Sequence, residues 1–263
     1  MGTISIPDWN GDEIACAHSK GGVRVVAHPY DNLIRTGCRP WPPAEIVQKL
    51  YKSRHEGAFS DEDKKVLSKG LGYYCDLQSL HSEDAITWSV FGTAAGAPQP
   101  NLRAWLRDLC GILDLPTVQP DDAQIDLWRR VPHPDTLVSG GPEIDVSIFT
   151  TNTVILVEAK WKSSVARGQG KNRDKDQIQL RGEFFKKYGA RIFPNQPNLI
   201  VAGIGLSSEG FTDTTPEGIT FTSATWQQVC SLASHPHAKE VRQYYEWKKK
   251  NTKMDQERVG TAR

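Results

Sequence analysis

The stretch that most constrains the fold of this chain is residues 142–161, which predicts a β-hairpin with charges at its far end. Apolar and polar side chains alternate in residues 143–148, residues 150–153 supply a polar turn, and residues 154–157 form a β-branched apolar run typical of a buried strand.

Three charged residues lie at the end of this hairpin. Glu158 and Lys160 end the second strand and point to the same face, because side chains alternate along a strand. Asp145 of the first strand can lie beside them. Burying unpaired charge is costly, so these residues indicate either a strand-end ion pair or a functional site.

The composition is that of an ordinary soluble protein of 263 residues, long enough for one large domain or for one domain with an extension. The net charge of +1 makes no overall case for nucleic acid or membrane. No apolar run approaches the roughly 20 residues of a membrane span, and the N-terminus lacks the pattern of a secretory signal. Five scattered cysteines fit reduced thiols, so we expect a cytoplasmic protein that contacts no membrane.

The chain divides into three parts. Residues 1–75 are an N-terminal extension or a small accessory module, and the sequence leaves both open. Residues 76–235 form the main α/β domain. Residues 236–263 are a basic C-terminal helix or tail. From Glu246 onward we expect a frayed helix that ends in disorder, because this part is polar and cationic.

The expected elements of the main domain form a mixed sheet flanked by helices. The predicted helices are residues 80–91, 101–113, 176–188 and 225–232, and the predicted strands are residues 125–131, the hairpin and residues 198–206.

Two of these helices carry a polar residue on the packed face. Glu83 shares a face with Ile86, Thr87 and Val90, with Ser82 or Ser79 as the cap. A first-turn acid that complements the helix dipole explains Glu83 equally well. Gln177 faces inward at the start of the helix over residues 176–188.

Positive charge is concentrated in residues 160–191, where ten lysines and arginines face three acidic residues. This pattern indicates either a solvated or disordered loop or an electrostatic footprint for phosphates. The candidate phosphate-binding side chains are Lys162, Arg167, Lys171, Arg173 and Lys175.

The arrangement resembles the bipartite signature of the PD-(D/E)XK nuclease superfamily. Its elements here are Pro-Glu-Ile-Asp-Val at residues 142–146 and Glu-Ala-Lys at residues 158–160. Ser-Glu-Asp-Ala-Ile-Thr-Trp, which contains Glu83, is similar to the helix that bears an additional glutamate in many members, and Asp-Gln-Ile-Gln-Leu, which contains Gln177, is similar to the glutamine helix of RecB-like nucleases. The resemblance covers residues 82–206, about half of the chain.

One position departs from this signature. The residue beside Pro142 is Glu143, which shares a strand face with Asp145, so either residue could be the first acid. We favour Asp145 because it lies deeper in the apolar alternation.

The resemblance implies a restriction-endonuclease-like fold and a Mg²⁺-dependent DNA endonuclease of the restriction, repair or mobile-element defence kind. Asp145 and Glu158 are hard oxygen ligands that suit Mg²⁺ or Mn²⁺. The Ala159 carbonyl and Glu83 are further ligands by resemblance. Lys160 is expected beside the attacking water, and Gln177 is expected to orient Lys160 or the scissile phosphate.

The expected partner is DNA, and a homodimer would supply the two active sites that double-strand cleavage commonly needs. Two other functions remain open. One is a catalytically inactive nucleic-acid-binding or scaffold protein with the same fold, and the other is a nuclease directed at RNA.

Overall fold

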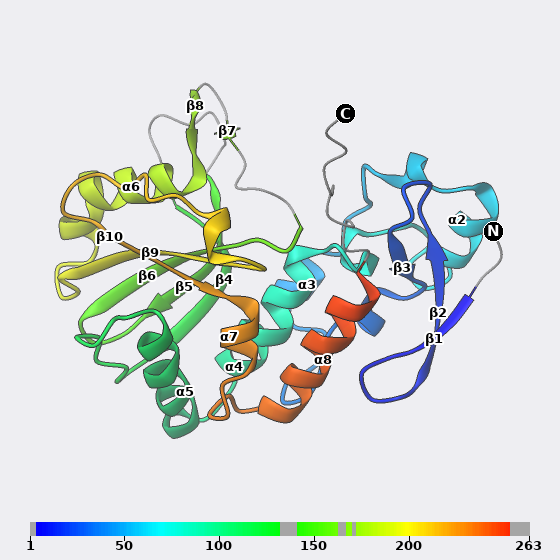
Figure 1. The fold of residues 1–263 in the computed structure, drawn as a ribbon, viewed down its shortest axis with the longest axis horizontal. Coiled ribbons are helices and arrows are strands. Elements are labelled where there is room, and N and C mark those ends of the chain that lie inside the picture. The colour runs from blue at the N-terminus through cyan, green and yellow to red at the C-terminus, as the bar shows by residue number, and fades with distance from the viewer. Residues whose placement is uncertain (1–3, 132–140, 163–166, 170–171, 253–263) are drawn as a thin grey trace, which may run out of the picture.

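The structure is a computed structural model that describes residues 4–131, 141–162, 167–169 and 172–252. For residues 163–174 nothing is said of side chains. A five-stranded mixed sheet with the strand order β10-β9-β6-β5-β4 lies at the centre of the main part, and helices pack on both of its faces (Figure 1). The predicted α/β class, with a mixed sheet flanked by helices, is confirmed at this level.

Strands β5 (Glu143–Phe149) and β6 (Thr153–Ala159) form the predicted hairpin. They are antiparallel, and Val146 pairs with Val157. Every residue of β6 is buried, which agrees with its apolar, β-branched sequence.

Strand β4 (Gln124–Arg130) extends the sheet on the other side of β5 and is antiparallel to it. Its register places Trp128 opposite Asp145, and the φ of Trp128 is 55°. A positive φ is rare for so bulky a residue and marks local backbone strain at this end of the sheet.

Two parallel strands complete the sheet: β9 (Asn198–Gly205) pairs with β6, and β10 (Thr220–Thr225) pairs with β9. Strand β9 was predicted from its apolar run. Strand β10 was not, because its largely polar sequence is that of an edge strand and carries little apolar signal.

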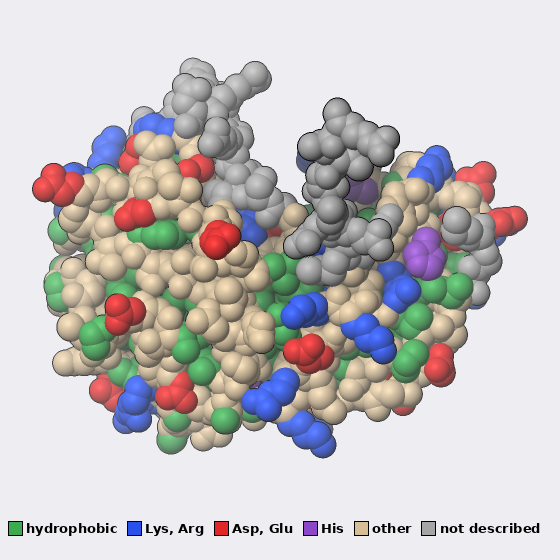
Figure 2. Space-filling model, viewed as in Figure 1, with side chains coloured by type: hydrophobic (Ala, Val, Ile, Leu, Met, Phe, Trp, Pro, Cys, Tyr) green, Lys and Arg blue, Asp and Glu red, His purple; other side chains and the backbone are tan. Residues whose placement is uncertain are grey.

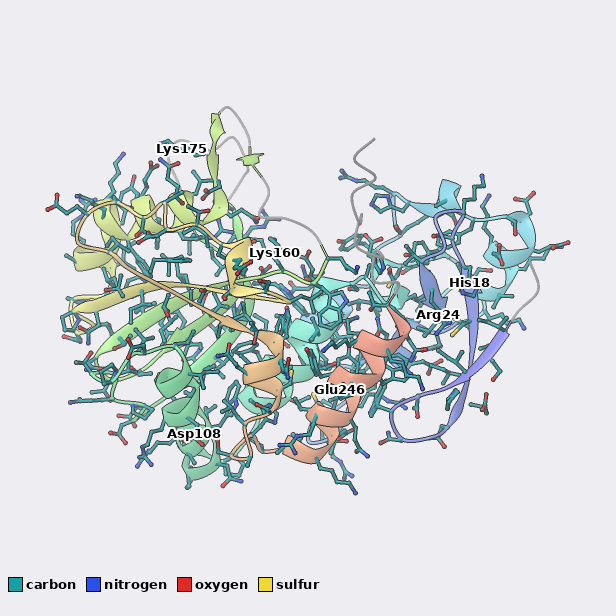
Figure 3. All side chains as sticks on the ribbon, in the orientation of Figure 1. His18, Arg24, Asp108, Lys160, Lys175 and Glu246 are labelled. Carbon is teal, nitrogen blue, oxygen red and sulfur yellow. The ribbon has the colours of Figure 1, made fainter. Side chains whose placement is uncertain are left out.

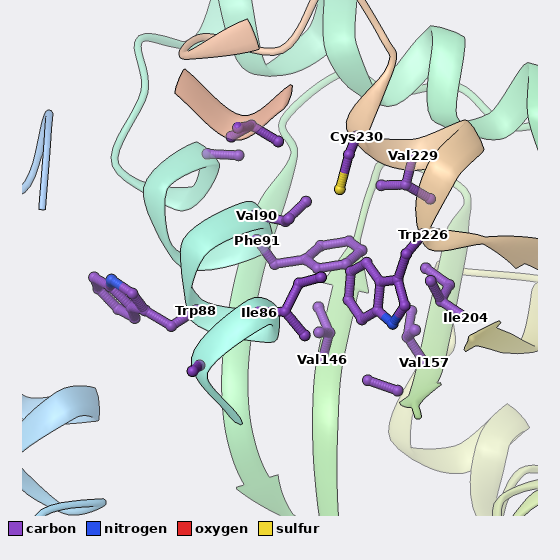
Figure 4. Packing of buried hydrophobic residues seen from close by; sticks show 14 of the residues in the cluster. Ile86, Trp88, Val90, Phe91, Val146, Val157, Ile204, Trp226, Val229 and Cys230 are labelled. Atoms are coloured by element: carbon purple, nitrogen blue, oxygen red, sulfur yellow. The ribbon is translucent and has the colours of Figure 1, made fainter. Parts of the chain in front are cut away.

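Helix α6 (Gln177–Ile192) covers one face of the sheet, and its Phe184 and Phe185 belong to the same apolar cluster as Leu156 and Val201. The opposite face packs against a larger cluster (Figure 4). The helical segments over this face are α3 (Glu83–Thr87), a π-helical turn (Trp88–Gly92), α4 (Thr93–Ala95), α5 (Gln99–Ile112) and α7 (Trp226–Cys230).

The N-terminal part is built on a small antiparallel sheet with the order β1-β2-β3. Its strands and helices are β1 (Ile4–Pro7), β2 (Glu13–His18), β3 (Arg24–Val26), α1 (Ala44–Val47) and α2 (Asp61–Leu67), with 3-10 turns at Pro29–Asn32, Glu56–Ala58 and Asp76–Gln78. Ser60 caps α2 by accepting a hydrogen bond from the Asp63 amide. Cys16, Val26 and Leu33 belong to the same apolar cluster as the main sheet, so the two parts share one core.

The expectation of a frayed C-terminal helix is wrong over residues 246–251. Helix α8 (Ala238–Asn251) is regular and packs against the core through Val241, Tyr244 and Trp247. Lys248 is fully buried on this helix. The apolar residues at helical spacing outweigh the lysines that made the segment look like a solvated tail.

Part of the basic segment after β6 is described by the structure. Its described residues include a short antiparallel hairpin of β7 (Arg167–Gln169) and β8 (Asn172–Asp176), which leads directly into α6 (Figure 1). Among the described residues, no helix has the length and apolar character needed to cross a membrane.

Candidate active site

Asp145 and Glu158 lie side by side at the end of the β5–β6 hairpin. Asp145 comes one position before Val146 and Glu158 one position after Val157, so in this antiparallel hairpin both lie next to the Val146–Val157 pair on the same side. The Ala159 amide donates a hydrogen bond of 2.8 Å to Asp145 Oδ2. Burial and the neighbouring charge of Glu158 raise the pKa of Asp145 well above its ordinary value, although Lys160 opposes this shift.

Lys160 joins two carboxylates through its ammonium group. Its Nζ lies 2.7 Å from Glu158 Oε1 and 3.3 Å from Glu83 Oε2. Burial works to lower the pKa of Lys160, but Glu158, Asp145 and Glu83 together outweigh burial and raise it above its ordinary value. Lys160 is therefore held in its protonated form, in which it cannot act as a base. Figure 3 shows it near the middle of the molecule, apart from Lys175.

The backbone of Lys160 is held from two directions by parts of the chain that come later in the sequence. Its amide donates to the Ile204 carbonyl of β9 at 2.8 Å. Its carbonyl accepts from Trp226 Nε1 of α7, also at 2.8 Å. The position of the Lys160 side chain is thus set by the sheet and by α7 together.

Glu83 reaches the cluster from the first residue of α3. Ser82 caps this helix by accepting a hydrogen bond of 3.2 Å from the Ala85 amide. Both interpretations of Glu83 therefore hold: it is a first-turn acid at the positive end of a helix, and it contacts Lys160.

Arg181 is a member of the cluster that sequence reasoning missed. It is 1% exposed, and its Nη2 lies 3.2 Å from Glu158 Oε2 and 2.7 Å from the Glu143 carbonyl. Gln177 is buried one turn earlier on α6. The spacing of four residues between Gln177 and Arg181, which places both on one helix face, was the signal that could have identified it.

Glu143 belongs to a second ion cluster. Lys49 Nζ lies 2.5 Å from Glu143 Oε1 and 3.2 Å from Asp84 Oδ2, and it also lies over the Trp128 ring. Glu143 is therefore paired with Lys49, whereas Asp145 is the acid that lies beside Glu158. Lys49 was not foreseen because it comes from the N-terminal part, 94 residues before Glu143.

The predicted phosphate-binding residues are only partly described. Lys162 is half-buried. Lys175 Nζ forms an ion pair of 2.6 Å with Glu183, which offsets its charge. The side chains of Arg167, Lys171 and Arg173 lie outside the described residues. On the face shown in Figure 2, acidic and basic side chains are interspersed.

The residues present fit a hard divalent cation through a small set of ligands. Among the described residues, no group of three or more histidine, cysteine or acidic side chains is arranged to hold a metal ion. Mg²⁺, however, is commonly held by one or two carboxylates and keeps several waters. Asp145 and Glu158 are such a pair, and burial together with the charge of Glu158 raises the pKa of Asp145.

Comparison with protein-family models, with curated proteins and with solved structures found no match to this chain. What the site can do chemically must therefore be inferred from the geometry of its residues. The site contains two adjacent carboxylates and a fixed ammonium. It is partly open around Glu83, whose side chain is 27% exposed. These are the parts needed to bind a cation and a phosphate together.

Proposed function

We propose that this chain is a metal-dependent nuclease that hydrolyses phosphodiester bonds in DNA. The observation that carries the proposal is the meeting of Asp145, Glu158 and Lys160 on one face of the β5–β6 hairpin. We further propose that the mixed sheet has the restriction-endonuclease-like fold. The order of β4, β5 and β6, followed by α6 and the parallel strand β9, supports this fold.

Each residue has a distinct role in this proposal. When bound, Mg²⁺ or Mn²⁺ supplies the charge that polarises the phosphate and makes water a stronger nucleophile. Asp145, Glu158 and the Ala159 carbonyl would hold the cation, with Glu83 beside them.

The protein's own contribution is orientation and charge. The Lys160 ammonium stabilises negative charge that develops on the phosphate, because the carboxylates around it keep it protonated. Arg181 is a positioning residue, since it holds Glu158 from the side away from Lys160. Gln177, at the start of the same helix, would orient Lys160 or the phosphate.

Cleavage of supercoiled plasmid DNA tests the proposal. We expect nicking with Mg²⁺ or Mn²⁺ and none with a chelator. Lys160→Ala and Glu158→Ala should each slow cleavage by about 100-fold or more, the usual loss for one charge-stabilising group. Lys65→Ala, at an exposed position on α2, is the matched control and should cut normally. A wild type that never cuts, or a Lys160→Ala variant that cuts normally, contradicts the proposal.

One observation favours a second function, a non-catalytic nucleic-acid-binding or scaffold protein. Glu158 is fully buried, and both of its oxygens lie beside cations. DNA binding that survives both active-site substitutions, in a wild type that does not cut, would support this alternative. Supplying RNA in the same assay distinguishes the two polymers. A homodimer would provide two cleavage sites, and light scattering of the purified chain measures that state.

A further inference from the structure

A pocket of about 370 Å³ lies between the N-terminal sheet and the start of α3. One wall contains Val23 and Val25, and another contains His81 and Ser82. Ser82 is the cap of α3, and the next residue, Glu83, contacts Lys160 at 3.3 Å. Ser82 on the pocket wall and Glu83 in the cluster are consecutive residues whose Cα atoms are about 3.8 Å apart, so a single step of the chain connects the pocket wall to the Asp145–Glu158–Lys160 cluster.

The lining of the pocket suits a small planar ring. Phe59 and Tyr74 contribute aromatic surface, with ring centroids 4.8 Å apart in an edge-to-face arrangement, and Ala58 adds an apolar wall. Asp76 supplies a carboxylate acceptor and His55 an imidazole, and the other polar residues of the lining are Ser19, Ser79, His81 and Ser82. A mostly apolar cavity with a few placed polar groups is the usual form of a site for a small organic group.

The charge of the lining favours a neutral ring over a phosphate. None of the residues that line the pocket, all of which the structure describes, is lysine or arginine. Asp76 would repel an anion, but it can accept a hydrogen bond from an amino or ring N–H group. The Ser53 hydroxyl donates to Asp76 Oδ1 and so fixes the orientation of the carboxylate.

We propose that this pocket receives one unstacked nucleobase of the nucleic acid bound at the catalytic cluster. The inference rests on the proposed nuclease function and names the part of the substrate that the N-terminal region would recognise. A base reaches the pocket only after it leaves its stack, either by extrusion from a duplex or from a single strand. Extrusion costs a few kcal/mol and is cheapest at a mismatch, while aromatic contact and hydrogen bonds offset that cost.

Fluorescence anisotropy with three labelled DNAs of equal length tests this inference. The probes are a matched duplex, the same duplex with one central mismatch, and a single strand, and the protein is full-length Lys160→Ala, which should bind without cutting. We expect the mismatched duplex to bind about 10-fold more tightly than the matched duplex, because its base is already unpaired. Tight binding of the single strand alone would instead identify single-stranded nucleic acid, and not an extruded duplex base, as the source of the base.

Pocket filling supplies the decisive comparison. Adding Ala58→Trp fills the cavity and should reduce the ratio of affinities for the mismatched and matched duplexes to about one. Adding Ala190→Trp, the same substitution at an exposed position on α6, should leave the preference intact. Equal affinity for all three DNAs, or a preference that Ala58→Trp does not alter, overturns the pocket assignment.

The two proposals fail in different ways. If the wild type cuts DNA but the preference is absent or insensitive to Ala58→Trp, the pocket assignment is wrong and the nuclease stands. If no metal supports cleavage but Ala58→Trp abolishes a clear preference, the nuclease is wrong and the pocket remains a base-binding site.

Discussion

Arg181 shows how a single residue can hold a buried carboxylate in place. It neutralises Glu158 in a place where neither side chain is more than 1% exposed. A buried charge that loses its partner is strongly destabilising, whereas the intact pair adds little net stability.

We therefore expect Arg181→Met to lower the free energy of unfolding by about 3 kcal/mol, because Glu158 Oε2 and the Glu143 carbonyl both lose a donor. Arg181→Lys keeps the charge and should lose less. Urea denaturation followed by tryptophan fluorescence measures both. If Arg181→Met is as stable as the wild type, the guanidinium does not neutralise Glu158 in solution.

The sequence predicted the central residues of the site better than their surroundings. Alternation along two adjacent strands was enough to bring Asp145, Glu158 and Lys160 together. It could not reveal Arg181 or Lys49, because cations are normally exposed, and only tertiary packing shows which ones are buried against an acid.

At the scale of elements, α8 combines a regular helix with a buried lysine. The Lys248 ammonium has no ion-pair or hydrogen-bond partner among the described residues and lies 5.4 Å from the Trp161 ring centroid and 5.9 Å from that of Tyr244. Burial lowers the pKa of Lys248 from 10.5 to about 7.

This lysine should make stability rise with pH. Between pH 7 and 10.5 the unfolded chain binds a proton at Lys248 that the folded chain does not, so unfolding becomes less favourable as pH increases. The gain approaches about 1.4 kcal/mol per pH unit for one group.

Urea denaturation of the wild type and of Lys248→Met at pH 7, 8 and 9 isolates this contribution, because the other titrations cancel in the difference. Lys248→Met should be the more stable protein at pH 7, and the gap should narrow as pH rises. A gap that is constant with pH would mean that Lys248 stays protonated in the folded state.

The apolar pattern of α8 was readable from the sequence and was overlooked. Apolar residues recur at helical spacing at Val241, Tyr244, Tyr245 and Trp247. The run of lysines from residue 248 masks this pattern, because lysines are typical of a solvated helix end. Strand β10 is different, since its sequence is too polar for periodicity to reveal it and only pairing with β9 defines it.

At the scale of the whole molecule, Lys49 ties the N-terminal part to the main sheet. Whether residues 1–75 form a separate module was open from the sequence. The shared apolar cluster and the Lys49 contacts with Asp84 and Glu143 join them to the sheet, and such long-range contacts leave no periodic signal.

Replacing Lys49 with Met should lower the free energy of unfolding by about 2 kcal/mol, less than for a fully buried pair because Asp84 and Glu143 are partly exposed. Adding Glu143→Gln removes one of the two carboxylates left without a cation and should restore part of the lost free energy of unfolding. A double-mutant cycle by urea denaturation measures this coupling, and strictly additive effects would show that the Lys49–Glu143 contact is not formed.

The two backbone hydrogen bonds of Lys160 also bear on when the cluster can form during synthesis. Their partners, Ile204 and Trp226, are translated well after Lys160 itself. A growing chain whose residue 226 is still inside the ribosome lacks one of these supports, so the ammonium takes its final position only after residue 226 has emerged. For the proposed nuclease, this order of assembly would leave little opportunity to cut nucleic acid before residue 226 has emerged.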